Sequence, residues 1–84
     1  MKVILTYETG ASTMEDVMKV FPLHKEYLEN FKKTYKILGI GPFKDRSGSM
    51  AIFEDVPTAE KFSENDPFVT HGVAKNVKIQ EWID

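Results

Sequence analysis

The 84-residue sequence has no cysteine, a single arginine and no long hydrophobic run. Without cysteine there is no disulfide framework, no thiolate nucleophile and no cysteine-based zinc or iron–sulfur site. Small secreted domains are usually cross-linked by disulfides, so we expect a reducing, cytoplasmic location. No apolar segment approaches the ~20 residues that a membrane span requires, and residues 1–8 turn polar too soon for a signal peptide.

The shortage of arginine and the formal net charge of −2 also exclude a strong electrostatic footprint for nucleic acid. Arg46 alone can offer the bidentate fork that suits phosphates and guanines. The hydrophobic share of 42% is that of a globular protein. A chain of this length forms one domain, residues 1–84, and buries only about 60–65% of its unfolded surface, so its own core is thin.

Apolar periodicity predicts four strands and two helices. The most secure element is an amphipathic helix, in which Leu23, Tyr27, Leu28, Phe31 and Tyr35 recur at spacings of three and four. Proline is tolerated in a first helical turn, so we expect this helix to start at Pro22. The second helix is expected after Pro57, with Thr58 as its N-cap. Residues 14–20 are expected to form a helical turn or a mobile connection. The strands are expected at 3–7, 37–43, 50–54 and 77–83, with a loop at 10–13 and a turn at 45–48.

The order strand, helix, strand, strand, helix, strand predicts an α+β protein, a ferredoxin-like β-α-β-β-α-β sandwich with both helices on one face of a four-stranded antiparallel sheet. A sheet that meets water on its other face alternates apolar and polar residues. Here Ile4 lies between Val3 and Leu5, and Ile52 lies between Ala51 and Phe53, so both faces are apolar. We therefore expect a homodimer whose sheets stack face to face.

His24 and Asp66 are the candidates for chemistry. An imidazole serves as a general base or acid near neutral pH, but a histidine in an apolar stripe is also a common hydrogen-bonded core residue. Asp66 before Pro67 fits a helix N-cap, and its second oxygen can still orient an imidazole. His71 before Gly72 fits a helix C-terminus. No close ligand spacing supports a metal site.

The sequence resembles the YCII-related family over most of its length. The resemblance rests on Leu23-His24-Lys25-Glu26-Tyr27-Leu28, Gly39-Ile40-Gly41-Pro42, Gly48, Asp66-Pro67-Phe68, Gly72-Val73 and Glu81-Trp82, in this order. It implies a dimeric ferredoxin-like α/β-barrel, related in shape to muconolactone isomerases, with His24 and Asp66 as the catalytic pair. One branch of the family removes chloride from a chlorinated hydroxyquinone.

Two positions depart from that family pattern. Many members carry an arginine a few residues before the helix histidine, whereas this sequence reads Met18-Lys19-Val20-Phe21-Pro22, so an anion-binding role for that arginine has no counterpart here. The position before Gly72 is usually small and here is His71.

We expect a cofactor-independent enzyme that moves a proton, by isomerisation or elimination, on a small organic molecule. His24 would transfer the proton, Asp66 would hold its tautomer, and the substrate would contact Tyr7, Gly41, Pro42, Ser49 and Phe68. Ser49 is not expected to be a nucleophile, because no Gly-x-Ser-x-Gly pattern surrounds it. The alternative is a non-catalytic dimeric module that binds a small ligand or assembles with a partner segment.

Overall fold

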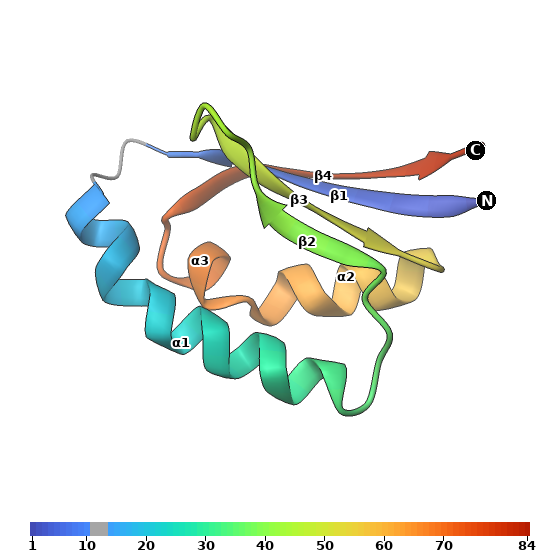
Figure 1. Ribbon diagram of the computed structural model, residues 1–84, viewed down its shortest axis with the longest axis horizontal. Coiled ribbons are helices and arrows are strands. Elements are labelled where there is room, and N and C mark those ends of the chain that lie inside the picture. The colour runs from blue at the N-terminus through green and yellow to red at the C-terminus, as the bar shows by residue number, and fades with distance from the viewer. Residues whose placement is uncertain (11–13) are drawn as a thin grey trace.

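The computed structural model describes residues 1–10 and 14–84 as a four-stranded antiparallel sheet with helices on one face (Figure 1). The predicted α+β order and the antiparallel sheet are confirmed, while the predicted loop at 10–13 falls mostly outside the described residues. In chain order the elements are β1 (Lys2–Thr9), α1 (Met14–Lys32), β2 (Gly39–Pro42), β3 (Gly48–Phe53), α2 (Val56–Asn65), α3 (Pro67–Thr70) and β4 (Ala74–Trp82).

Helix α1 begins at Met14, so the predicted start at Pro22 is wrong. Proline inside a helix removes the bond to the carbonyl four residues earlier, here that of Met18. Both Pro22 and Met18 lie on the exposed side of the helix, where water can solvate this carbonyl. Glu15 and Asp16 in the first turn also complement the positive end of the helix dipole. The helix therefore continues through the proline.

Helix α2 is capped by Asp55, so the predicted cap at Thr58 is also wrong. The backbone of Asp55 is extended, and its carboxylate accepts a hydrogen bond from the Thr58 amide at 2.8 Å. Asp55 stands before Val56-Pro57, so the proline occupies the first turn, where its missing N–H costs nothing. Asp66 does cap α3, as the Asp-Pro pattern predicted.

The strand order is β2-β3-β1-β4. Because β1 and β4 are antiparallel neighbours, Lys2 pairs with Trp82 and both chain ends lie together at one end of the sheet (Figure 1). A register shift interrupts this pairing near Asn76, which has a positive φ of 48°. The pairing resumes beyond the shift, so β4 starts at Ala74, earlier than the predicted residue 77, and reaches Trp82.

The core lies between the sheet and the helices. Side chains from alternate positions of β1 and β3 meet aromatic rings of α1 and α2: Phe31, Phe53 and Phe62 pack with centroid separations of 5.0 to 6.4 Å. The Tyr27 hydroxyl donates to the Phe62 carbonyl at 2.9 Å and ties α1 to α2. The buried members of the core cluster are Val3, Leu5, Tyr7, Phe31, Ala51, Phe53, Ala59 and Phe62.

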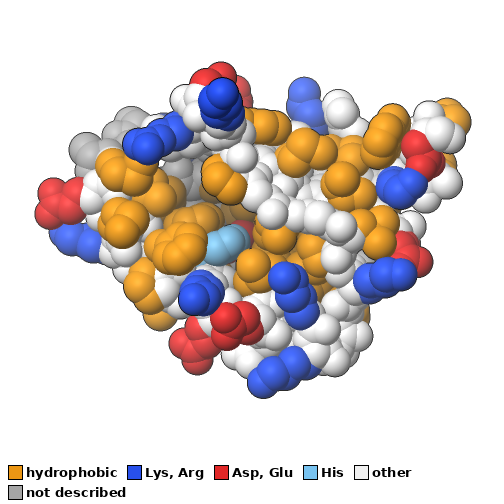
Figure 2. Space-filling model, viewed as in Figure 1, with side chains coloured by type: hydrophobic (Ala, Val, Ile, Leu, Met, Phe, Trp, Pro, Cys, Tyr) orange, Lys and Arg blue, Asp and Glu red, His pale blue; other side chains and the backbone are white. Residues whose placement is uncertain are grey.

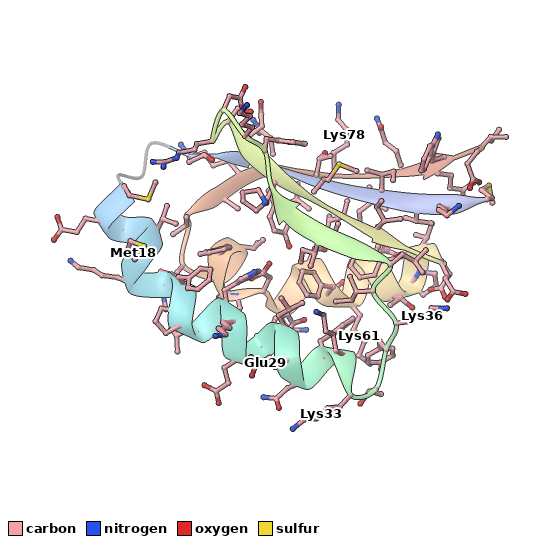
Figure 3. The ribbon with its side chains drawn as sticks, viewed as in Figure 1. Met18, Glu29, Lys33, Lys36, Lys61 and Lys78 are labelled. Carbon is pink, nitrogen blue, oxygen red and sulfur yellow. The ribbon has the colours of Figure 1, made fainter. Side chains whose placement is uncertain are left out.

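The outer face of the sheet carries the other half of each strand. Ile4 pairs with Ile52 and Thr6 pairs with Met50, and all four are only half-buried. Lys78 projects from this face, away from the helices (Figure 3). The expectation that both faces of the sheet are apolar thus holds for the central strands, and no described element of this chain covers the outer one.

Candidate active site

A cavity of about 660 Å³ opens at the end of the sheet that is remote from the chain ends. Its walls come from the N-terminal half of α1, the helix-facing side of β1 and β3, the hairpin between β2 and β3, and α3. The face viewed in Figure 2 shows a histidine set among hydrophobic side chains. The lining is mostly apolar and includes Leu5, Met14, Val17, Phe21, Ile40, Phe43, Ala51, Phe62, Val73 and Ala74.

Asp66 lies behind this lining and is fully buried. Its Oδ1 accepts hydrogen bonds from His24 Nδ1 at 2.8 Å and from the Phe68 amide at 3.1 Å, and its Oδ2 accepts one from the Tyr7 hydroxyl at 3.0 Å. A carboxylate that only accepts matches three donors without conflict. Asp66 therefore joins β1, α1 and α3 at one point while it caps α3.

This geometry assigns the tautomer of His24. Because Asp66 Oδ1 accepts, the proton of the neutral imidazole lies on Nδ1, and Nε2 keeps its lone pair. The ring stacks on Phe68 with a centroid separation of 4.2 Å and an interplanar angle of 17°, which fixes its plane. The His24 side chain is 12% exposed and lines the cavity, so a ligand in the cavity can reach it. In this tautomer, Nε2 of His24 is the ring nitrogen that is able to accept a proton.

Tyr7 completes the group from the strand β1. It lines the cavity, and its hydroxyl donates to Asp66. Burial is the main cause that raises the pKa of Tyr7 well above its ordinary value, and the charge of Asp66 together with this hydrogen bond raises it further. Tyr7 is therefore a neutral phenol that holds the second oxygen of Asp66.

The structure brings the predicted site residues together. Besides His24, the cavity is lined by all five residues expected to contact the substrate, Tyr7, Gly41, Pro42, Ser49 and Phe68. Asp66 touches the cavity only through His24 and Tyr7, so it can position a reacting group but does not meet a ligand itself. His71 is the C-cap of α3, is exposed, and does not line the cavity.

Sequence reasoning missed two parts of the wall. Met14, Val17 and Phe21 precede the predicted start of the helix, yet with His24 they follow the spacing three, four, three that places residues on one helical stripe. The stripe is visible in the sequence, but it was divided because the helix was expected to start at Pro22. Lys44 and Arg46 also line the cavity, from a hairpin turn whose local sequence predicts only a turn.

Among residues 1–10 and 14–84, no three histidine, cysteine, aspartate or glutamate side chains gather as a metal site would need. In the same part of the chain, no helix is both long enough and apolar enough to cross a membrane.

Comparison with known proteins places this chain in a family. The model of the YCII-related domain matches residues 1–83. The chain belongs to the YCII-related family. A solved structure, the 5-chloro-2-hydroxyhydroquinone dehydrochlorinase TftG from Burkholderia phenoliruptrix AC1100 in complex with 2,5-dihydroxybenzoquinone, is similar with a TM-score of 0.79 and 26% sequence identity. The match covers 99% of this chain and 94% of TftG. No curated protein matches the sequence.

TftG is a dehydrochlorinase, and its structure holds 2,5-dihydroxybenzoquinone. The YCII-related chain described here shares its fold over nearly the full length of both proteins.

Proposed function

We propose that the protein is a small-molecule enzyme in which His24 removes a proton from a carbon next to a carbonyl. The observation that carries this proposal is the chain of hydrogen bonds from Tyr7 through Asp66 to His24 Nδ1, with the His24 ring at the wall of an apolar cavity. An oriented base in a cavity of this size is typical of catalytic sites.

In the proposed elimination, Nε2 of His24 takes the proton, the electron pair of that C–H bond forms a π bond to the neighbouring carbon, and chloride leaves that neighbouring carbon with its own bonding pair. On a chlorinated hydroxyhydroquinone this step acts on the keto tautomer of the ring, in which these two carbons are saturated and lie next to carbonyls. In an isomerisation, the electron pair forms a π bond to the carbonyl carbon, the C=O π pair moves to the oxygen, and its return lets the proton add to a different carbon. Asp66, 2.8 Å from Nδ1, stabilises the positive charge that develops on the imidazole. The step requires only side chains of this chain.

The substrate would be a ring compound that contacts Tyr7, Gly41, Pro42, Ser49 and Phe68, all of which line the cavity. The likeness to TftG supports a chlorinated hydroxyhydroquinone or a related ring as the first compound to try. General-base catalysis typically contributes 10²–10⁴-fold in rate, which suffices for an elimination from an already activated ring.

The test is release of chloride from 5-chloro-2-hydroxyhydroquinone and related chlorinated rings, measured with a chloride electrode. We expect His24→Gln to lower the rate about 10²–10⁴-fold, because glutamine is similar in size but cannot accept a proton. Lys33→Gln is the control: it removes a charge in the turn that follows the C-terminal end of α1 (Figure 3) and should leave the rate unchanged. Equal rates for the wild type and His24→Gln would refute the role of His24.

A second candidate function is a non-catalytic module that binds a small ligand. This alternative is favoured by the low exposure of His24, whose side chain stacks on Phe68 and is only 12% exposed. Binding of 2,5-dihydroxybenzoquinone in the cavity without turnover of any chlorinated ring, and with the same affinity in His24→Gln, would support binding alone.

We also propose that two copies pair through the outer face of the sheet. Ile4, Met50 and Ile52 are apolar and half-buried there without cover from residues 1–10 and 14–84, and a side chain at Gly41 would meet open space. Ile52→Lys places a charge at the centre of this face and should convert a dimer to a monomer in sedimentation equilibrium. A monomeric wild type at micromolar concentration would contradict the pairing.

A further inference from the structure

The charge of the cavity differs in sign from the charge of the protein. The chain has 13 acidic and 11 basic residues and a net charge of −2. Yet the only formally charged side chains among the described lining residues are Lys44 and Arg46, and no aspartate or glutamate lines the cavity. The carboxylate of Asp66 lies behind the wall and is held by three donors, so the charges that a ligand meets directly are those of the two cations. They attract a negatively charged ligand.

Both cations come from the hairpin between β2 and β3, and this hairpin is held firmly over the cavity. The Thr9 amide donates to the Ser47 carbonyl at 2.9 Å, and the Thr9 hydroxyl donates to the Arg46 carbonyl at 3.0 Å. The Phe43 amide closes the hairpin by donating to the Gly48 carbonyl at 2.8 Å. Arg46 and its guanidinium are therefore carried by a turn that is anchored to β1 rather than by a free loop.

Two carboxylates on the hairpin and on β1, those of Asp45 and Glu8, accept hydrogen bonds from other side chains. Asp45 Oδ1 accepts from the Ser47 amide at 2.9 Å and from the Ser47 hydroxyl at 2.6 Å. The Glu8 carboxylate accepts from the side-chain amide of Asn76. In the part of the chain that the structure describes, neither Lys44 nor Arg46 forms an ion pair. Their charges are available to a ligand.

The backbone of Arg46 supports the same conclusion. Its φ of 63° lies in the left-handed region, which glycine adopts without strain and other residues adopt at a cost. A glycine would suit this turn better, so the arginine side chain is present in spite of the local backbone preference. Residues held in this region are enriched at ligand sites, although Asn76 shares it at the register shift of β4.

We propose that the cavity selects organic anions: ring compounds that carry a carboxylate or an acidic ring hydroxyl. The oxyanion pairs with Arg46 and Lys44 at the mouth, and the ring lies against Phe21 and Phe68 near His24. This proposal rests on the proposed function and names the substrate class for the same site. The planar guanidinium of Arg46 can hold both oxygens of a carboxylate, whereas Lys44 adds a point charge.

The test uses matched pairs of single-ring compounds, each as a carboxylate and as its uncharged carboxamide, for example salicylate and salicylamide. Binding is followed at millimolar ligand by the NMR shifts of the Gly41, Gly48 and Phe68 amides, which report on the cavity wall. We expect the acids to bind at least ~3- to 10-fold more tightly than the amides, with an affinity that falls as salt is added.

Three variants complete the experiment. Arg46→Gln should weaken the acids ~3- to 10-fold and leave the amides unchanged, and Arg46→Lys should recover part of the loss. Lys33→Gln removes the same charge far from the cavity and should have no effect. Equal binding of acids and amides, or no effect of Arg46→Gln, would overturn the selection of anions while the proposed reaction stands. If no compound of either kind shifts the cavity amides, the selection of ring anions fails, while the proposed reaction is still judged by the release of chloride.

Discussion

The carboxylate of Asp66 provides the sharpest test of the site, because a second aspartate in the same chain serves as its control. Asp66 and Asp55 both cap helices through one oxygen. Asparagine ranks with aspartate as an N-cap, so a role limited to capping predicts little effect of Asp→Asn at either position. Asp66 differs because it is fully buried and also accepts from His24 and Tyr7.

Asp66→Asn keeps the size of the side chain but replaces one acceptor oxygen with an NH₂ group. That group then faces either the Tyr7 hydroxyl or His24 Nδ1, and at least one buried donor loses its acceptor. An unsatisfied buried donor costs about 1–3 kcal/mol, a large part of the ~5–15 kcal/mol that stabilises a typical domain. Each kcal/mol lowers the melting temperature of a domain of this size by about 4–8 °C. Asp66→Ala would abandon three donors, so we expect it not to fold.

The assay is urea unfolding followed by far-ultraviolet circular dichroism for the wild type, Asp66→Asn and Asp55→Asn. We expect Asp66→Asn to lose about 1–3 kcal/mol of unfolding free energy and Asp55→Asn to match the wild type. Ring ¹⁵N shifts of His24 should also change from a pure Nδ1–H tautomer to a mixture in Asp66→Asn. If the two variants are equally stable and the tautomer is unchanged, Asp66 is a helix cap only and the proposed orientation of His24 fails.

The remaining predictions concern neighbours of this site. Tyr7→Phe leaves Asp66 Oδ2 without a donor and should lower the unfolding free energy by about 1–3 kcal/mol, measured in urea near pH 7. Because the pKa of Tyr7 is raised in the folded state, its neutral form is stabilising below pH 10, and the contribution should fall above pH 10 by about 1.4 kcal/mol per unit. Urea unfolding at pH 9, 10 and 11 checks this, since Tyr7→Phe should lack that part of the slope. A β-carbon at Gly48 would lie 2.0 Å from the Tyr7 carbonyl oxygen, so Gly48→Ala should lower the unfolding free energy by at least about 1–3 kcal/mol. A β-carbon at Gly41 would meet open space, so Gly41→Ala should be tolerated. Equal melting temperatures of the two variants would contradict the close approach of β1 and β3.

Much of the fold follows from local patterns. Alternation in the strands, the helical spacing from Leu23 to Tyr35 and the turn residues near Gly48 are each encoded within a few positions, so the element order could be predicted. The errors came where one local rule competes with another. Pro22 is a common helix start, but here the stripe from Met14 to His24 outweighs one missing hydrogen bond.

The site was less accessible from sequence. His24 and Asp66 were proposed from the family resemblance, because a histidine in a stripe and an aspartate before proline have structural explanations of their own. The bond from Tyr7 to Asp66 joins residues 59 positions apart and depends on the register of β1 in the sheet, which no local pattern records. The position of Lys44 and Arg46 at the mouth of the cavity could not be anticipated either, because only the folded hairpin brings them to the cavity wall.

The pairing of β1 with β4 has a practical consequence. Lys2 lies opposite Trp82, and the amino group of Met1 is 3.5 Å from the carboxylate of Asp84. A linker of a few residues could therefore join the ends, and new ends could be opened in the turn at 44–47. Such a circular permutant would keep every strand neighbour of the sheet while freeing the hairpin that carries Lys44 and Arg46. Ligand binding by this permutant would show how much the closed hairpin contributes to the affinity, apart from the side chains of Lys44 and Arg46.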